Sequence, residues 1–354
     1  MAYTTIDDGS AHFQTLTYTG NGSSSRALTN DGNSDLQPDW LWVKNRSNVV
    51  NHGAWDSSRG AGKRLLPNVT DVEEDQSNVA SFDSDGFSIG ATGDIINTNT
   101  HTYVAWQWKA NGGTTSSNTD GDITSTVQAN TTAGFSIVTY TGNGTDGASI
   151  GHGLSGAWDV IIVKNRDATD YWTVDRDASS GTSSALLLHD PSQEAGHGTI
   201  HYRGSSGLFT AHSNGDLTMG NGSGEKYVAY VFKEIQGYSK FGSYAGNNAA
   251  DGPFIYTGFK PAWVMTKCTS ANSTSWFIFD NKRSPVNVVD DILFPNGTDA
   301  ETTNSSSGAI DMLSNGFKIR GTNSNFNAAS STQFYMAFAE SPFVSSEGVP
   351  ITAR

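Results

Sequence analysis

The histidines are the first residues in this chain whose type and spacing could do chemistry. Five of the eight lie between residues 152 and 212, and His197 and His201 have the i, i+4 spacing of zinc ligands on a helix. Gly196 and the intervening Gly-Thr-Ile argue against a helix there, and residues four apart on a strand lie about 13 Å from each other. One metal ion cannot join ligands at that distance, so we predict no metal site and no cofactor.

Paired aspartates in the stretch FDSDGFSIG, residues 82–90, form a candidate calcium loop. An EF-hand loop needs more oxygen ligands and a glutamate at its twelfth position, and neither is present. Similar stretches at 212–220 and 313–321 have Ser-Asn-Gly where this one has Ser-Asp-Gly. Because Asp or Asn before Gly is typical of hairpin turns, we interpret all three stretches as hairpins.

No stretch of the sequence carries a known catalytic motif. Glycosidases need two carboxylates at a defined separation, and no acidic motif recurs at the predicted strand centres. The sequence has no serine nucleophile elbow, no phosphate-binding loop and no dinucleotide fingerprint. We therefore predict no catalytic residues and no enzyme activity, while β-folds can still assemble sites from distant strands.

The elements that would position these residues form a unit that occurs three times. WDVIIVKNR at 158–166 matches WLWVKNR at 40–46 and, more weakly, AWVMTKC at 262–268. Just before them, FQTLTYTGNG at 13–22 shares seven of ten letters with FSIVTYTGNG at 135–144. β-branched and alternating residues predict strands, Asn-Gly predicts the turn that follows, and four consecutive apolar residues indicate a strand covered on both faces.

A third predicted strand in each unit carries an aspartate near its end, 11 to 13 residues after the lysine of the second strand. The pairs are Lys44 and Asp56, Lys164 and Asp175, and Lys267 and Asp280. We expect the hairpin between the strands to bring each pair close together. Such a pair is either a repeated ligand-binding feature or a structural ion pair worth about 0–1 kcal/mol if exposed.

Each unit closes with an aromatic strand, TYVAWQWK at 102–109, KYVAYVFK at 226–233 and FYMAFAE at 334–340. The alternation of rings with small residues indicates core and sheet packing, and outward rings could instead stack on sugars. The single cysteine, Cys268, ends an apolar run, so we predict a small buried side chain and no intrachain disulfide.

These patterns predict an all-β protein of tandem β-sandwich units, of jelly-roll or concanavalin-like type. The predicted segments are an N-terminal tail 1–11, sandwich repeats 12–110, 134–236 and 237–343, a polar segment 111–133 between the first two repeats, and a C-terminal tail 344–354. Small polar residues make 111–133 either a flexible linker or an extended strap.

The net charge and the composition exclude several classes of binding partner. A net charge of −14 argues against nucleic-acid binding and against an anionic membrane surface. We expect no signal peptide, because the N-terminus has neither a basic nor an apolar region, and no membrane insertion, because no run reaches the length of a span.

Several strings together resemble a family of virion structural proteins of tailed bacteriophages, best known in tail fibres of marine phages. They are YTGNG, VKNR, GHGL at 151–154, SDGFSIG, YVAWQWK, GYSKFGSYAGN and YMAFAESPF. The resemblance covers residues 12–343 approximately. It implies a concanavalin-like or jelly-roll β-sandwich, a location on the virion and other virion proteins as partners. It carries no catalytic residues that could be transferred.

Three functions follow as hypotheses. The first is a tail-fibre or receptor-binding component that recognises host surface glycan without catalysis. The second is a capsid decoration or head-fibre protein, and the third is a fibre enzyme that degrades polysaccharide. The ligand-binding residues, and the choice between a homotrimer and three units that imitate a trimer within one chain, stay open at this point.

Overall fold

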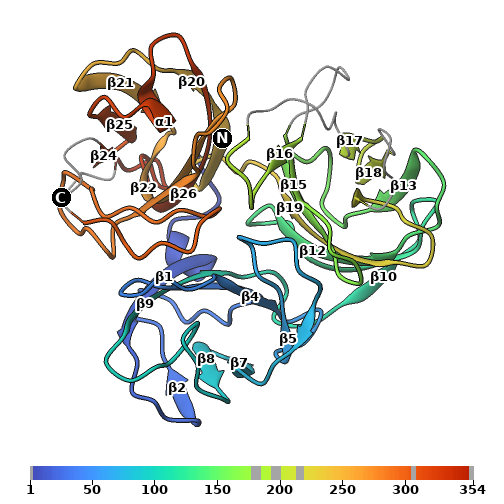
Figure 1. Ribbon diagram of the computed structural model, residues 1–354. Helices are drawn as coiled ribbons and strands as arrows, with labels where there is room; N and C mark the ends of the chain where they lie inside the picture. Colours follow the sequence, from blue (N-terminus) through green and yellow to red (C-terminus); the bar gives the residue numbers. More distant parts are fainter. Residues whose placement is uncertain (1–2, 177–184, 193–200, 213–218, 304–307, 351–354) are drawn as a thin grey trace.

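The computed structural model describes residues 3–176, 185–192, 201–212, 219–303 and 308–350 (Figure 1). Nearly all regular structure in these ranges is β, with a single-turn helix α1 (Ser324–Asn327) and a 3₁₀ turn η1 (Gly9–Ala11). The prediction of an all-β sandwich fold is confirmed. We call residues 12–110, 134–236 and 237–343 unit 1, unit 2 and unit 3.

Each unit contains an antiparallel sheet in which the first and second long strands flank the closing strand. The order in unit 1 is β1 (Phe13–Thr19), β9 (Thr102–Trp108), β3 (Trp40–Asn45) and β4 (Gly53–Asp56). The order in unit 2 is β12 (Phe135–Thr141), β19 (Lys226–Phe232), β14 (Val160–Asn165) and β15 (Trp172–Arg176), followed by β16 (Leu186–Leu187). The order in unit 3 is β20 (Ser239–Ala245), β26 (Thr332–Pro342), β22 (Phe259–Cys268) and β23 (Phe277–Asp280).

A smaller three-stranded sheet lies against each of these sheets. Its strands are β2 (Arg26–Leu28), β8 (Gly86–Ile89) and β7 (Val79–Asp83) in unit 1, β13 (Ala148–Gly151), β18 (Leu208–Ala211) and β17 (His201–Arg203) in unit 2, and β21 (Asp251–Tyr256), β25 (Gly316–Arg320) and β24 (Ala309–Leu313) in unit 3. A short hairpin of β5 (Lys63–Arg64) and β6 (Glu74–Asp75) extends unit 1. The two sheets of units 1 and 2 enclose separate apolar cores.

The second strand of each unit is buried on both faces, as its apolar run predicts. In β3, Leu41 and Val43 point into the sandwich core of unit 1, while Trp40 and Trp42 point into a second core shared by all three units. The three lobes are arranged around this shared core (Figure 1). Rings from different units touch there, as in the stack of Trp40 on Tyr230 at 4.3 Å. Burial of large rings on this scale is the main force that joins the units.

The 111–133 segment is an extended strap. It contains β10 (Ser116–Asn118) and β11 (Ser125–Asn130), and β11 pairs with β12 along six residues from Ser125 to Asn130. The alternative interpretation, a flexible linker, is wrong for this part of the chain because its backbone forms a sheet ladder.

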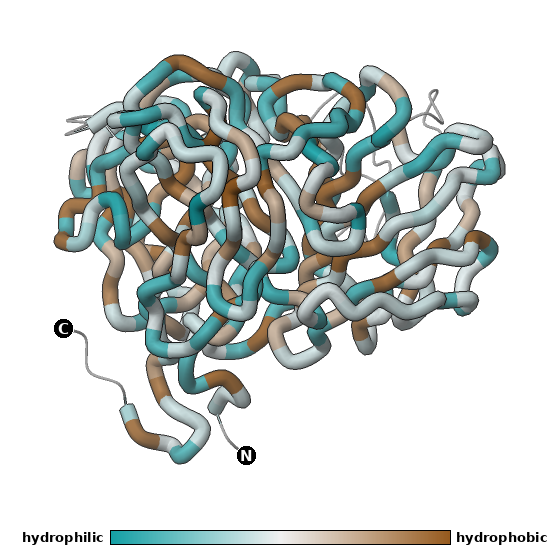
Figure 2. Tube along the Cα trace, turned by 90° about the horizontal axis from the view of Figure 1, so that it is seen from below, coloured by the Kyte–Doolittle hydropathy of each residue, from teal (hydrophilic) through white to brown (hydrophobic). Residues whose placement is uncertain are grey.

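The N-terminal segment lies against unit 3, and the C-terminal segment contacts the N-terminal one. Ile6 is buried in the shared core, and the Tyr3 hydroxyl donates to the Gly258 carbonyl at 2.9 Å. The Ser346 amide donates to the Asp7 carboxylate at 2.6 Å. Figure 2 shows the two ends of the chain on the same side of the molecule.

Candidate functional site

The predicted Lys–Asp pairs do not form. In unit 1, Trp40 lies opposite Asp56 and Val43 opposite Gly53, so Lys44 and Asp56 are at opposite ends of the hairpin. Four strand residues separate them, a distance of about 13 Å. Both interpretations of these pairs, as ligand sites and as ion pairs, are therefore wrong.

The three lysines are instead buried, and two of them, Lys44 and Lys267, bind carbonyls of a neighbouring unit. Lys44 Nζ donates to the carbonyls of Asn45 at 2.7 Å and of Thr298, in unit 3, at 3.2 Å. Lys267 Nζ donates to Thr274 and to the carbonyl of Pro191, in unit 2, at 3.1 Å. Burial lowers the pKa of Lys44, Lys164 and Lys267 to about 8. Carbonyl cages of this kind fix loops of neighbouring units and leave no free amine for a ligand.

Asp56 belongs to a buried charge network at the junction of units 1 and 2. Arg59 donates to Asp56 at 2.5 Å and to Glu73 at 2.8 Å, and Glu73 also accepts from Arg166 of unit 2 at 2.8 Å. Burial alone would raise the pKa of Glu73, but the hydrogen bonds and charges of Arg166 and Arg59 outweigh it and hold the pKa below its usual value. The network keeps every buried charge paired, as a structural role requires.

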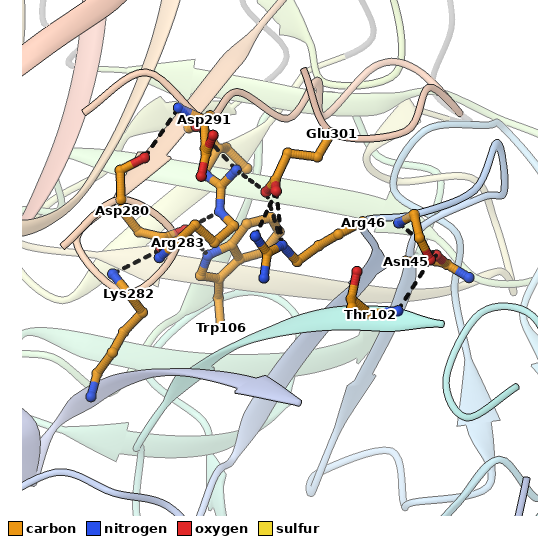
Figure 3. A network of polar contacts seen from close by, with 12 residues as sticks. Asn45, Arg46, Thr102, Trp106, Asp280, Lys282, Arg283, Asp291 and Glu301 are labelled. Atoms are coloured by element: carbon orange, nitrogen blue, oxygen red, sulfur yellow. Dashed lines mark hydrogen bonds and ion pairs between the residues drawn. The ribbon is translucent and has the colours of Figure 1, made fainter. Parts of the chain in front are cut away.

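An equivalent network joins units 3 and 1 (Figure 3). Arg283 donates to Asp280 at 2.6 Å and to Glu301 at 2.9 Å, and Glu301 accepts from Arg46 of unit 1 at 2.6 Å. The indole of Trp106, also from unit 1, donates to Asp280 at 3.0 Å. Two of the three predicted aspartates thus hold units together.

The third aspartate, Asp175, points to the other face of its sheet. Ile161 lies opposite Asp175, while Val160 lies opposite Arg176, the position that Asp56 occupies in unit 1. Asp175 accepts a hydrogen bond at 2.8 Å from Nδ1 of His201, and both side chains are buried.

The structure does not bring the candidate metal-binding residues together either. His201 is occupied by Asp175, and His197 lies outside the described residues. No group of three or more potential metal ligands occurs in the described ranges. The acidic stretch at 82–90 is the β7–β8 hairpin, in which Asp83 accepts from Ser81 and Ser88 at 2.6 Å and Gly86 has φ +107°. The hairpin interpretation is confirmed there.

The closing strands pack inward. The rings of Tyr103, Trp106, Tyr227 and Tyr230 are buried, which confirms core packing for these positions. Cys268 is buried, as predicted.

A pair of exposed rings on unit 3 was missed by the sequence reasoning. Phe254 and Tyr256, two residues apart on β21, are 45% and 56% exposed and lie on the outer face of the β21–β25–β24 sheet. Lys318 is the cross-strand partner of Phe254, and its ammonium group lies 2.9 Å from Asp251. The Tyr256 hydroxyl lies 3.4 Å from that of Tyr3.

Units 1 and 2 carry small residues at the same two positions. The three units can be aligned on one buried aliphatic residue in the edge strand of the smaller sheet, which lies opposite a buried phenylalanine in every unit. The pairs are Leu28 and Phe87, Ile150 and Phe209, and Ile255 and Phe317. The residues before and after it are Ala27 and Thr29, Ser149 and Gly151, and Phe254 and Tyr256. Aligning the three copies in the sequence would have shown that only unit 3 has aromatic residues at these two positions.

The fold and these junctions define a class of protein: an all-β chain of joined sandwich units with a shared aromatic core. The chain belongs to the family described as "Domain of unknown function (DUF7483)", whose model matches residues 8–342. No curated protein and no solved structure matches the chain significantly. Within the described ranges, no helix has the length and apolar character needed to cross a membrane.

Proposed function

We propose that the protein is a structural component of a tailed-phage virion that binds host surface glycan through the outer face of unit 3, without cleaving it. The virion location rests on the sequence resemblance. The observation that carries glycan binding is the exposed pair Phe254 and Tyr256.

Sugar rings present a face of C–H groups that packs against the negative face of an aromatic ring. Phe254 and Tyr256 alternate with a buried residue, so their side chains project from the same face of the sheet, about 6–7 Å apart along the strand. Hydroxyl groups of a sugar would find donors and acceptors beside them in Lys318 and Asp251. One exposed apolar residue is ordinary, but an adjacent aromatic pair is typical of a binding surface.

The charges around the rings are balanced. Asp251 pairs with both Lys318 and Arg320 at 2.9 Å, and Arg320 also pairs with Asp311 at 2.6 Å. A surface with two cations and two anions suits an uncharged polyol better than a strongly acidic polymer, which the net charge of −14 would repel.

Binding without turnover is supported by the state of the Asp251 carboxylate. A glycosidase needs a carboxylic acid with a raised pKa beside a second carboxylate. Here the hydrogen bond from Lys318 and its charge lower the pKa of Asp251. An acid of this kind is ionised at neutral pH and cannot protonate a leaving group.

Capsid decoration, or a head-fibre role, is the second candidate. It is favoured by the outer edge of β20, which pairs with no strand in the described ranges and is suited to attachment to another virion protein.

A glycan array tests the first proposal. Labelled full-length protein is compared with the double variant Phe254→Ser/Tyr256→Ser and with Val49→Ser, which removes a more exposed apolar residue from unit 1. We expect the wild type and Val49→Ser to bind the same glycans, the double variant to lose at least tenfold in affinity, and no sugar to be released. Equal binding by the double variant would remove unit 3 as the site. Released oligosaccharide would favour a fibre enzyme, and binding to emptied capsids but to no glycan would favour decoration.

A further inference from the structure

In each unit, the first strand is the outermost of the four strands that the units have in common. The three units therefore have three equivalent sheet edges, on β1, β12 and β20. The edge of β12 is occupied by the strap, whose strand β11 pairs with it antiparallel. Unpaired edges expose rows of backbone donors and acceptors that bind added strands. The strap therefore shows what kind of group fits such an edge.

The strap also fills the adjoining junction of units 1 and 2. Gln128 of β11 accepts hydrogen bonds from the amides of Asn111 at 3.1 Å and Gly113 at 2.9 Å. Its amide group donates to the hydroxyls of Ser57 at 2.9 Å and Ser58 at 2.8 Å. One long polar side chain of an added strand thus satisfies the polar groups at this junction.

At β1, a loop of the same unit covers the corresponding place. Gln14 donates to the carbonyl of Ser34 at 2.7 Å and accepts from the amide of Gly32 at 3.0 Å. A cavity of about 190 Å³ remains beside it.

The edge of β20 is the open one. Ser243 and Ala245 are exposed, and no strand in the described ranges pairs with this side. The Phe241 amide bonds to the Glu234 carboxylate at 2.8 Å instead of to β26. Because backbone amides alternate in direction along a strand, the Ser243 amide points the same way, toward the open side.

A cavity of about 480 Å³ lies beside this edge, between units 2 and 3. Its lining includes Lys240–Ser243 of β20, Asp159 before β14 and Arg176 at the end of β15. The corresponding positions at the filled junction are Asp39 before β3 and Asp56 at the end of β4, next to the Ser57 that binds Gln128. The cavity therefore occupies the place that Gln128 fills between units 1 and 2.

We propose that the outer edge of β20 binds an extended segment of a partner protein as an added antiparallel strand, with one long polar side chain of that segment entering the cavity. The segment resembles β11 in chemistry: small, β-branched and uncharged polar residues, with a Gln-like amide that enters the cavity beside the ion pair of Lys240 and Glu234. Main-chain hydrogen bonds provide affinity, and the cavity provides selectivity. This site is independent of the glycan face on β21.

A synthetic peptide copy of the strap, fluorescein-labelled DITSTVQANT (residues 122–131), serves as the probe for the full chain. We expect saturable binding in fluorescence anisotropy and slower hydrogen exchange of the β20 amides, with no effect from a scrambled peptide of equal composition. Ser243→Pro removes one outward amide, which proline tolerates on an edge strand, and should weaken binding at least tenfold. Ser243→Lys, which keeps the amide but adds charge at the edge, is the second variant if the proline variant does not fold.

The same experiment can overturn the proposal. Absence of peptide-dependent protection on β20, or binding that is unchanged in both Ser243 variants, contradicts it. Sedimentation of the free chain tests whether a second copy occupies the edge. Dimers that dissociate in Ser243→Pro would assign the edge to contact between two copies of this chain and would contradict binding of a partner protein.

Discussion

The hydroxyl of Tyr230 donates a 2.7 Å hydrogen bond to the carboxylate of Asp56, and the two residues come from different units. Both side chains are fully buried. Burial, more than any neighbour, raises the pKa of Tyr230 well above its usual value, so the hydroxyl keeps its proton. Trp106 makes the corresponding contact to Asp280, so two junctions share one design with two different donors.

Tyr230→Phe should destabilise the protein by about 2 kcal/mol, because a buried carboxylate loses one hydrogen bond but keeps Arg59. Urea unfolding followed by tryptophan fluorescence measures the change. Tyr202→Phe, at a half-buried position of β17, is the control and should stay within about 0.5 kcal/mol of the wild type. Equal effects of the two changes would show that the Asp56 contact contributes nothing specific.

Glu301→Gln should cost about 3–5 kcal/mol, because it leaves Arg46 and Arg283 without their shared anion in a buried network. Asp75→Asn breaks the exposed pair with Lys63 and should cost about 0–1 kcal/mol. Chemical denaturation of both variants at one pH gives the comparison. A loss below about 1 kcal/mol in Glu301→Gln would mean that the ion pairs of Glu301 add little to the stability of the junction of units 3 and 1.

Acid should weaken the fold through His152. Burial lowers the pKa of His152 to about 4, and the nearby Lys233 adds to the effect. The unfolded chain takes up this proton near pH 6.5, whereas the folded chain stays neutral until about pH 4. The unfolding free energy therefore falls as pH drops from 6.5 to 4, by on the order of 3 kcal/mol for this group.

His152→Asn isolates that contribution, because its side-chain oxygen can still accept from the Leu154 amide as Nδ1 does. Thermal unfolding across pH 4–7 should show a shallower pH dependence in the variant than in the wild type. Parallel curves for the two proteins would rule out His152 as a source of acid sensitivity.

Phe254→Ser and Tyr256→Ser should change the unfolding free energy by about 0.5 kcal/mol or less each, since exposed side chains contribute little to packing. Phe317→Ser, in the buried core of the same sheet, should cost at least about 3 kcal/mol. Differential scanning fluorimetry ranks the three. Large losses at Phe254 or Tyr256 would give the rings a structural role and weaken the case for a binding surface.

The strands and turns could be predicted because their causes are local. The apolar run of β3 predicts a strand covered on both faces, and the structure places Trp40 and Leu41 in different cores. Asp before Gly86 predicts a turn, and this glycine does adopt positive φ. The sequence does not decide between a linker and a strap at 111–133, because small polar residues give no sign of which sheet edge they will meet.

The polar sites could not be predicted because they depend on register. In an antiparallel hairpin, the end of the first strand lies beside the start of the second. Lys44 lies at the end of the first strand and Asp56 at the end of the second, so the hairpin holds the two side chains apart. Asp175 comes one residue too early, and a shift of one residue moves a side chain to the other face. The partners of Asp56 and Asp280 come from other units, and no local pattern encodes them.

Matching letters also misaligned the last strand of unit 3. YMAF at 335–338 resembles YVAW at 103–106, but Phe338 lies opposite Trp263 as Trp108 lies opposite Trp40. The alignment by letters is therefore shifted by two residues from the alignment by strand register. A shift of two residues keeps the same side chains facing inward, so the pattern of alternating residues does not reveal it.

Carrying the three units on one polypeptide has a consequence for how the surface can change. In a symmetric homotrimer every substitution is made three times, so a new residue must suit three faces at once. Here unit 3 holds Phe254 where unit 1 has Ala27 and unit 2 has Ser149, and only unit 2 carries the strap. Each lobe can therefore acquire its own task while the common aromatic centre stays unchanged.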